Sequence, residues 1–328
     1  MQKNSVFLLL TTKCNQRCKF CYTRGTVTEN SDSFITEEDF KTALDWISEY
    51  YDPESTIIRL TGGEPTLHSK LPEFIKQISK KDFPISLITN GSRFREVFQE
   101  VRDFNVRVQF SLEGIGELHD RIVGKKGSFK NLIASIELAL REDINMHTNT
   151  TLSRLNRKQI FDIFRFLSKL GVRAASLNYV TPTKFNRDIM LDFYEISEVY
   201  RKVKLLAGCL EMSISTLMAI PMCISDQGSG CAVGIGDVTI TPELKAYCCP
   251  AITFPDTQLG DIRKNSIEEL FDSWIYRSIS QTFEHLPEVC RNCRFVQKCK
   301  GGCYLFWRHG LMQDYELSEK NAVKVGGG

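Results

Sequence analysis

Three cysteines near the start of the chain, Cys14, Cys18 and Cys21, lie in one short loop with the spacing C-x3-C-x2-C. Thiolates spaced this closely are typical ligands of iron–sulfur clusters, in which each iron takes its own protein ligand. Three thiolates are one too few for a [4Fe-4S] cluster, so a cluster held here would keep one iron open to a small molecule. The alternative is that these are three unrelated cysteines.

A second group of cysteines, Cys290, Cys293, Cys299 and Cys303, has the spacing C-x2-C-x5-C-x3-C and is the most specific feature of the sequence. Four such thiols suit either a tetrahedral Zn²⁺ ion that braces the fold or an iron–sulfur cluster. The chain holds 12 cysteines in 328 residues. This surplus of thiols, together with the first loop, favours iron over zinc.

The first loop, including the aromatic Phe20 before its last cysteine, resembles the cluster loop of the radical S-adenosylmethionine (SAM) superfamily. The resemblance implies that the open iron chelates the amino and carboxylate groups of SAM. It also implies that an electron from the cluster cleaves SAM to a 5′-deoxyadenosyl radical, which takes a hydrogen atom from an unactivated carbon of a substrate.

The segment Gly62-Gly63-Glu64-Pro65 is similar to the GGEP segment that contacts the amino end of the SAM methionine in this superfamily. Glycines let a backbone approach a ligand closely, and a carboxylate beside them can accept hydrogen bonds from an ammonium group. Asn90 stands in another loop, where a simple turn is the alternative to ligand contact.

Further along, Ser111 and Arg121 lie in a stretch that resembles the family pattern S-x-D-G…HD-x-x-R-G. The resemblance implies that these residues hold the carboxylate and ribose region of SAM, and that Asn149 reaches the ribose. Glu113 stands where the family usually has Asp, and Val123 interrupts the spacing between the arginine and the glycine. Taken alone, each residue also has a structural explanation, such as a capping serine or a solvated arginine.

The later, cysteine-rich half resembles the SPASM domain, which follows the barrel in many radical SAM enzymes and usually binds two auxiliary [4Fe-4S] clusters. Residues 240–249 are similar to the hairpin of that domain, although Leu244 replaces the usual glycine. By the family's pattern, one cluster takes the ligands Cys231, Cys249 and Cys303, with Cys223 as the fourth. The other cluster takes Cys290, Cys293 and Cys299.

The family usually has a further cysteine downstream, and this chain has none after Cys303. The second auxiliary cluster therefore has either an open iron or a non-cysteine ligand, for which His309, Asp314 and Glu316 are in range by sequence. We accordingly expect one or two auxiliary clusters.

Two other cysteines need separate interpretations. Cys209 stands at the end of an apolar helical pattern and is predicted to be a buried small hydrophobe. Cys248 precedes a predicted ligand, and it is either a packing residue or a thiol that donates a hydrogen atom to a substrate radical, as cysteines do in radical epimerases.

The elements that must position these residues alternate along the first half of the chain. Six apolar or β-branched segments predict strands, at residues 6–10, 56–60, 85–89, 106–111, 144–151 and 174–180. Helical patterns separate them; one follows a sequence like a capping box at Thr36, and another is predicted to be capped by Ser128. Six such units are fewer than a full barrel needs, so we expect an open, partial (β/α)6 barrel with its site at the carboxyl ends of the strands.

Beyond residue 180 the alternation ends in a polar connector and one more helical pattern. We place a domain boundary near residue 210. Residues 1–210 then form the radical SAM partial barrel, and residues 211–328 form a small cysteine-rich α+β domain of the SPASM type.

The composition is that of a soluble globular protein, with 42% hydrophobic and 25% charged residues and a formal net charge of +2. Nucleic acid is not expected as a partner, because the basic clustering typical of such binders is missing. The apolar run Val6–Leu10 is too short for a membrane span or a signal sequence. We expect a cytoplasmic protein, in which cysteines serve as metal ligands more readily than as disulfides.

The resemblance implies an electron donor such as flavodoxin or ferredoxin, and a substrate that is a ribosomally made peptide undergoing crosslinking, epimerisation or oxidation. The first predicted strand begins about five residues into the chain, which leaves no room for a peptide-binding module before it, so a separate recognition protein would supply that function. One alternative is a dehydrogenase or epimerase of a small molecule such as a sugar or cyclitol. Another is a non-catalytic iron–sulfur or zinc-braced binding protein.

Overall fold

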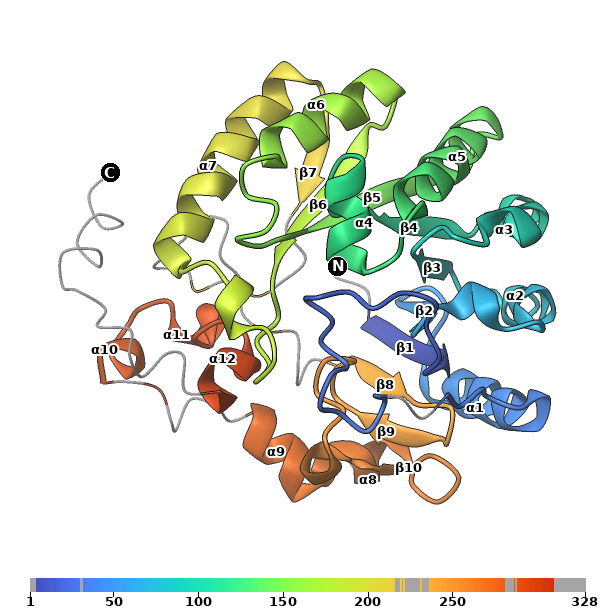
Figure 1. The fold of residues 1–328 in the computed structure, drawn as a ribbon. Coiled ribbons are helices and arrows are strands. Elements are labelled where there is room, and N and C mark those ends of the chain that lie inside the picture. The colour runs from blue at the N-terminus through green and yellow to red at the C-terminus, as the bar shows by residue number, and fades with distance from the viewer. Residues whose placement is uncertain are drawn as a thin grey trace.

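The computed structural model describes residues 4–29, 32–215, 236–280 and 288–309, together with Ala219, Pro221, Cys231 and Leu286. Its strands form one sheet of ten, in the order β10-β9-β8-β1-β2-β3-β4-β5-β6-β7. The strands are β1 Asn4–Thr11, β2 Thr56–Gly62, β3 Ile85–Thr89, β4 Arg107–Ser111, β5 Met146–Leu152, β6 Ala174–Tyr179, β7 Ser213–Ser215, β8 Val238–Ile240, β9 Lys245–Tyr247 and β10 Gly260–Asp261. Because β7 and β10 do not pair, the sheet stays open, which confirms the partial barrel (Figure 1).

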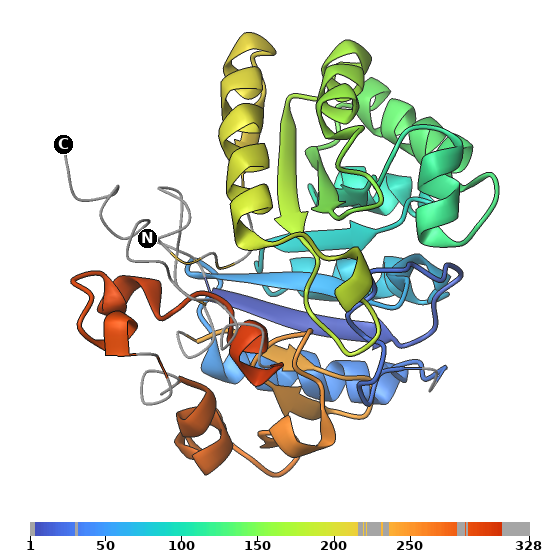
Figure 2. The ribbon, with the colours of Figure 1, turned by 60° about the vertical axis from the view of Figure 1, so that its left-hand side comes forward.

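Helices cover the outer face of the parallel strands, as Figures 1 and 2 show. The helices are α1 Glu37–Tyr50, α2 Leu71–Ser79, α3 Phe98–Asp103, α4 Glu117–Val123, α5 Ser128–Arg141, α6 Ile160–Leu170, α7 Phe193–Cys209, α8 Ile267–Asp272, α9 Trp274–Ser280, α10 Glu288–Arg291, α11 Val296–Cys299 and α12 Tyr304–Arg308. The apolar side of α1 packs inward, and Thr36 caps it by accepting a hydrogen bond from the Asp39 N–H. The predicted alternation of strands and helices is confirmed.

The two faces of the parallel strands differ in chemistry. On β4, Val108 and Phe110 are fully buried in the hydrophobic core, whereas Gln109 and Ser111 between and after them are polar. Side chains alternate between the faces of a strand, so these polar residues point into the barrel. Strands covered on both faces by apolar layers normally carry almost continuous hydrophobic runs. A polar interior therefore indicates that the barrel is lined for a ligand.

Two details of the sequence prediction were wrong. Ser128 does not cap α5, because Gly127 holds that position without a side-chain bond and the Ser128 hydroxyl instead accepts a hydrogen bond from Gln16. Cys209, predicted to be buried, is exposed, because it lies on the side of α7 opposite the buried residues such as Val203 and Ala207.

Two segments that follow the predicted boundary join opposite edges of the barrel sheet. The short strand β7 pairs in parallel with β6, and β8 pairs in parallel with β1. The predicted hairpin is present as β8 and β9. Its turn holds Leu244 at a φ of 61°, a strained conformation for a residue with a side chain. The Leu244 side chain is fully buried, which contributes about 2 kcal/mol and offsets that strain.

Among the described residues, no helix combines the length and the apolar character needed to cross a membrane.

Candidate active site

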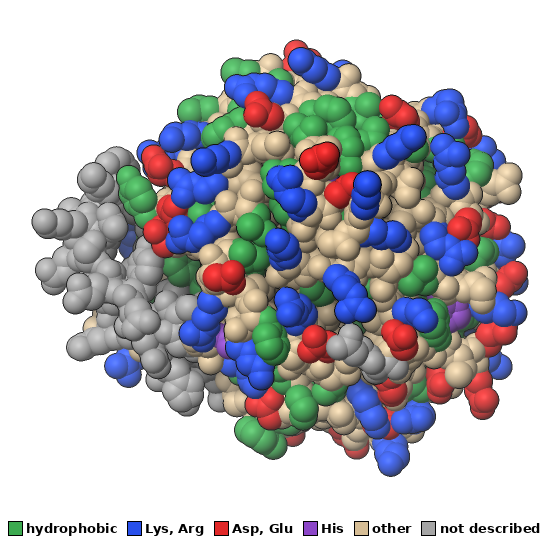
Figure 3. Space-filling view, in the orientation of Figure 1, with side chains coloured by type: hydrophobic (Ala, Val, Ile, Leu, Met, Phe, Trp, Pro, Cys, Tyr) green, Lys and Arg blue, Asp and Glu red, His purple; other side chains and the backbone are tan. Residues whose placement is uncertain are grey.

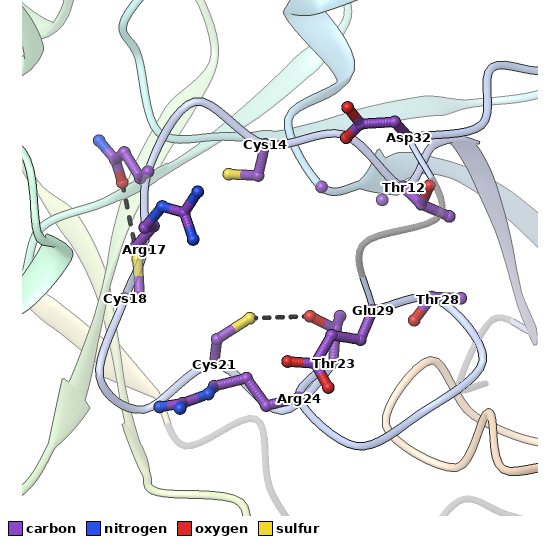
Figure 4. Close-up of a pocket in the computed structure, with 13 residues that line it drawn as sticks. Thr12, Cys14, Arg17, Cys18, Cys21, Thr23, Arg24, Thr28, Glu29 and Asp32 are labelled. Atoms are coloured by element: carbon purple, nitrogen blue, oxygen red, sulfur yellow. Dashed lines mark hydrogen bonds between the residues drawn. The ribbon is translucent and has the colours of Figure 1, made fainter.

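The three cysteines of the first loop surround one cavity of about 360 Å³, at the carboxyl end of β1. In Figure 4 their sulfur atoms border the same opening. Gly62 and Gly63 also line it, and so do charged side chains from the loop and its continuation, among them Arg17. A cavity of this volume lies in the range of small-molecule sites, about 300–1,000 Å³.

Backbone hydrogen bonds fix the loop that carries the cysteines. The N–H groups of Arg17 and Lys19 donate to the carbonyl oxygens of Val123 and Ile122, over 2.9 and 3.0 Å, at the end of α4. The loop therefore gains its shape from a helix about a hundred residues later in the chain.

Side chains at the next strand ends hold the loop from the other side. Asn15 donates to the hydroxyl of Ser92 over 2.8 Å and accepts from the Asn90 amide over 2.9 Å. These bonds leave Asn90 positioned beside the cavity, between the loop and the end of β3.

The two glycines after β2 are required by the close approach of two backbones. A Cβ atom on Gly62 would lie 2.1 Å from the carbonyl oxygen of Thr11, and one on Gly63 would lie 2.2 Å from that of Lys13. Gly62 also has a φ of 130°, which side chains rarely tolerate. These contacts press the segment after β2 against the start of the cysteine loop.

Glu64 connects the ends of β2 and β3. Its buried carboxylate accepts from the N–H and hydroxyl of Thr66, from the hydroxyl of Thr89 and from the Asn90 N–H, over 2.6 to 3.1 Å. Burial raises the pKa of this carboxyl group, and the four hydrogen bonds oppose that shift. The same carboxyl group borders a second cavity.

This second cavity, of about 150 Å³, shares the three cysteines with the first and extends toward β3 and β4. It brings together most of the predicted SAM-binding residues: Phe20, Gly62, Gly63, Glu64, Asn90 and Ser111. The convergence of residues from four strand ends supports a single ligand site beside the thiols.

Three predicted residues lie outside both cavities. Pro65 is buried as the first residue of a 3-10 helix behind Glu64. Asn149 pairs with Ser111 in the β4–β5 register, and its Oδ1 accepts from Ser176 and Asn178 over 2.9 and 2.7 Å.

Arg121 is the third of these residues. Its side chain is 66% exposed and lies 3.9 Å from the Glu117 carboxylate, on the outer side of α4. Its role in holding SAM stays a prediction.

Glu113 forms part of the wall of the second cavity, at the position where the family usually has Asp. Its carboxyl group accepts from the N–H of Thr151 over 2.8 Å, and its own N–H donates to Nδ1 of His119 over 3.1 Å. Burial raises the pKa of Glu113 to about 8. The group therefore keeps its proton at neutral pH and can donate as well as accept hydrogen bonds.

The later cysteines form two groups. Cys249, just after β9, is half-buried and lies next to Cys231 and Cys303. Burial raises its pKa, and the two neighbouring thiols raise it further. Burial likewise raises the pKa of Cys303 to about 12, with Cys231 adding to the effect. Cys248 is buried in the hydrophobic core and lies outside the two cavities of the barrel site.

The other group is carried by α10 and α11. The Cys293 N–H donates to the Cys290 carbonyl oxygen over 3.1 Å, and Cys299 and Cys293 both raise the pKa of Cys290 after burial. The predicted ligand Cys223 lies outside the described residues, as do Asp314 and Glu316. His309 is described, and its ring packs against Phe254.

No three Cys, His, Asp or Glu side chains in the described part of the chain converge on a point where one metal ion would sit. A [4Fe-4S] cluster does not require such convergence, because each thiolate binds a different iron. The donor set of the barrel cavity, three cysteine sulfurs beside glycine backbone and buried polar groups, fits a cluster that shares its open iron with a ligand.

Comparison with known proteins decides the family. Residues 8–195 match the family model of the radical SAM superfamily. The chain belongs to the radical SAM superfamily. Residues 231–294 match the SPASM family, described as an iron–sulfur cluster-binding domain. The chain accordingly binds SAM and a [4Fe-4S] cluster in the barrel and auxiliary iron–sulfur clusters in the SPASM domain.

Several known proteins are similar over most of the chain. The antilisterial bacteriocin subtilosin biosynthesis protein AlbA of Bacillus subtilis is 27% identical over 90% of this chain, which spans 66% of the length of AlbA. The AdoMet-dependent heme synthase of Methanosarcina barkeri is 24% identical over 89% of this chain and 88% of its own. The crystal structure of Streptococcus suis SuiB bound to its precursor peptide SuiA shares the fold, with a TM-score of 0.76, 14% identity and coverage of 94% and 73%.

Sequence reasoning missed two residues that contact the predicted cluster ligands. Gln16 and Thr23 both touch cysteine sulfurs, over 3.6 and 3.0 Å. Their positions beside the cysteines in the chain were the available signal, but short polar residues in a loop have too many other uses to be singled out by type.

Proposed function

We propose that this radical SAM enzyme modifies a ribosomally made peptide, by forming a crosslink, an epimer or an oxidised residue. The observation that carries the proposal is the cavity shared by the three thiols and the polar ends of β2 to β4. The similarity to AlbA, a protein of bacteriocin biosynthesis, over 90% of the chain supports a peptide as the substrate.

Different residues of the chain have different roles in this reaction. Cys14, Cys18 and Cys21 would hold the cluster, and Glu64 and Ser111 would orient SAM against the open iron. When bound, the cluster supplies the electron that cleaves SAM and starts hydrogen abstraction from the substrate. The protein must then fix the target carbon close to SAM and exclude water, because a misplaced radical would react elsewhere.

The barrel interior is polar on β5 and β6, but these groups do not line the cavities. The Oδ1 atom of Asn149 accepts hydrogen bonds from Ser176 and Asn178, and the Thr151 N–H donates to Glu113. The preference for a peptide over a ring system therefore rests on the similarity to AlbA.

The surface around the site suits an acidic partner that delivers electrons. Arg17, Lys19, Arg24 and Lys184 are exposed on loops around the cysteines. Figure 3 shows Lys and Arg side chains spread over this face, with Asp and Glu side chains among them. Positive charge near the cluster would steer a negatively charged flavodoxin or ferredoxin to it.

The test is anaerobic incubation of the iron-loaded protein with SAM, a reductant and short peptides encoded near its gene. The proposal predicts a peptide whose mass falls by hydrogen loss, or that gains deuterium from deuterated water on epimerisation. SAM cleavage without modification of any such peptide, but with a change in a small molecule, would instead support the second candidate.

That second candidate, modification of a small molecule, is favoured by the similarity to the heme synthase over 89% of the chain. It predicts that substrate modification depends on a low-molecular-weight fraction and does not change when peptides are added.

A further inference from the structure

Two of the three thiols in the cysteine loop touch a polar side chain two residues away in the sequence. The sulfur of Cys21 lies 3.0 Å from the Thr23 hydroxyl, and the sulfur of Cys18 lies 3.6 Å from Oε1 of Gln16. Figure 4 draws both contacts as dashed lines at the edge of the cavity. The amide nitrogen of Gln16 donates to the hydroxyl of Ser128 over 2.6 Å.

When iron binds, the bond between Cys18 and Gln16 must reverse its direction, and the Thr23 hydroxyl must be the donor to Cys21. A thiol can donate its proton, as Cys18 does to Gln16. A thiolate bound to iron has no proton and only accepts. An amide oxygen facing it would be repelled, whereas an N–H or O–H group would stabilise it.

Both side chains can make this change without moving the backbone. The Thr23 hydroxyl only has to rotate its hydrogen toward Cys21. The Gln16 amide can turn by half a rotation, which exchanges its nitrogen and oxygen. Ser128 can then donate to Oε1 of Gln16, because its hydroxyl, buried at the start of α5, does not serve as a helix cap.

We propose that Gln16 and Thr23 donate hydrogen bonds to the thiolates of Cys18 and Cys21 and thereby raise the reduction potential of the barrel cluster. This inference rests on the proposed cluster site. Hydrogen bonds to cluster sulfurs favour the more negatively charged, reduced state. They would thus ease the electron transfer that precedes SAM cleavage. The third thiol, Cys14, receives backbone N–H groups of Asn15 and Gln16, which lower its pKa against the effect of burial.

The test is a potentiometric titration of the iron-loaded protein followed by electron paramagnetic resonance (EPR), with the barrel cluster identified by the change of its signal on adding SAM. Thr23→Val and Gln16→Leu should each shift the midpoint to more negative potential at unchanged iron content. Thr23→Ser keeps the hydroxyl and should therefore keep the midpoint potential of the unmodified protein. Thr28→Val is the matched control, because its hydroxyl lines the same cavity but bonds to Thr26 and Thr253.

A full complement of iron with an unshifted midpoint in Thr23→Val and Gln16→Leu would overturn the inference. Loss of the cluster in Thr23→Val but not in Thr23→Ser would support it, because only the hydroxyl differs in kind. Loss of the cluster in both Thr23→Val and Thr23→Ser would overturn the inference, because it would show that the packing of the Thr23 side chain matters and its hydroxyl does not. Failure of the unmodified protein to hold a cluster would contradict the proposed function itself and is thus a distinguishable outcome.

Discussion

In the barrel, the cysteine loop is carried by long elements: β1 has 8 residues and α5, which packs behind the loop, has 14. The later cysteines are carried by α10, α11 and α12, which have 4, 4 and 5 residues. Helices this short are not stable alone. The barrel site therefore takes its shape from long elements of the fold. We expect the SPASM site to depend more on its clusters, in addition to the packing of Phe306 against Tyr179 and Phe193.

The burial of the cysteines differs between the two sites only at the extremes. Cys14 of the barrel is exposed and Cys299 of the SPASM site is buried, whereas the other described cysteine ligands predicted for both sites are half-buried. An exposed thiol beside an open cavity suits a cluster that must meet SAM.

The largest expected effect is on chemistry in the barrel. Replacing Cys14, Cys18 and Cys21 together by Ala should abolish SAM cleavage, because no ligands remain for the SAM-binding cluster. The circular dichroism spectrum should not change, since the backbone bonds of Arg17 and Lys19 to α4 persist. Formation of 5′-deoxyadenosine measures the first effect, and a matched Cys209→Ala variant, at an exposed thiol, should retain full cleavage.

The next prediction tests directly whether the barrel site and the SPASM site differ in their dependence on bound clusters. Removing all iron by chelation should expose the amides of residues 288–309 to hydrogen exchange, while β1 to β6 keep their protection. Peptide-level mass spectrometry measures both regions in one sample. Equal loss of protection in the two regions would contradict the idea that only the SPASM site needs its clusters to fold.

A smaller effect is expected at Glu64. Glu64→Ala leaves the donors of Thr66, Thr89 and Asn90 without their acceptor, which should destabilise the protein by about 2–3 kcal/mol and weaken SAM binding at unchanged iron content. Glu64→Gln keeps one oxygen and should lose less. Unchanged SAM affinity in Glu64→Ala, measured by calorimetry, would remove Glu64 from the binding site.

The smallest effect, taken per pH unit, is the dependence of stability on pH. Because the folded pKa of Glu113 is about 8, above its ordinary 4.5, the folded state binds the extra proton between these values. Stability should therefore fall as pH rises through this window, by at most about 1.4 kcal/mol per pH unit. Glu113→Gln should flatten the dependence of the melting temperature on pH from 5 to 8. Glu117→Gln, at a 95% exposed side chain, should leave it unchanged.

The sequence predicted the barrel well because its strands are short apolar or β-branched runs with clear ends. The predicted strand at residues 85–89 matches β3, and its neighbours differ by a few residues at the ends. It missed α4, a helix of only 7 residues whose polar sequence has no strong apolar period. That helix nevertheless fixes the cysteine loop.

The candidate site was predictable only where residue type and spacing carry the signal, as with the cysteines and the two glycines. The bond from Gln16 to Ser128 joins residues 112 positions apart, and no local pattern encodes it. A hydroxyl at a helix start is typical of a cap, so the prediction for Ser128 followed the local rule and missed the tertiary partner.

The most direct test of the central claim, an iron left open by three thiolates for SAM, is the EPR spectrum of the reduced, iron-loaded protein with and without SAM. The account predicts that SAM changes the spectrum of one cluster in the unmodified protein and in Cys303→Ala, and that this change disappears when Cys14, Cys18 and Cys21 are replaced. A SAM-dependent change that persists without these three cysteines, or its absence from the fully loaded unmodified protein, would contradict the account.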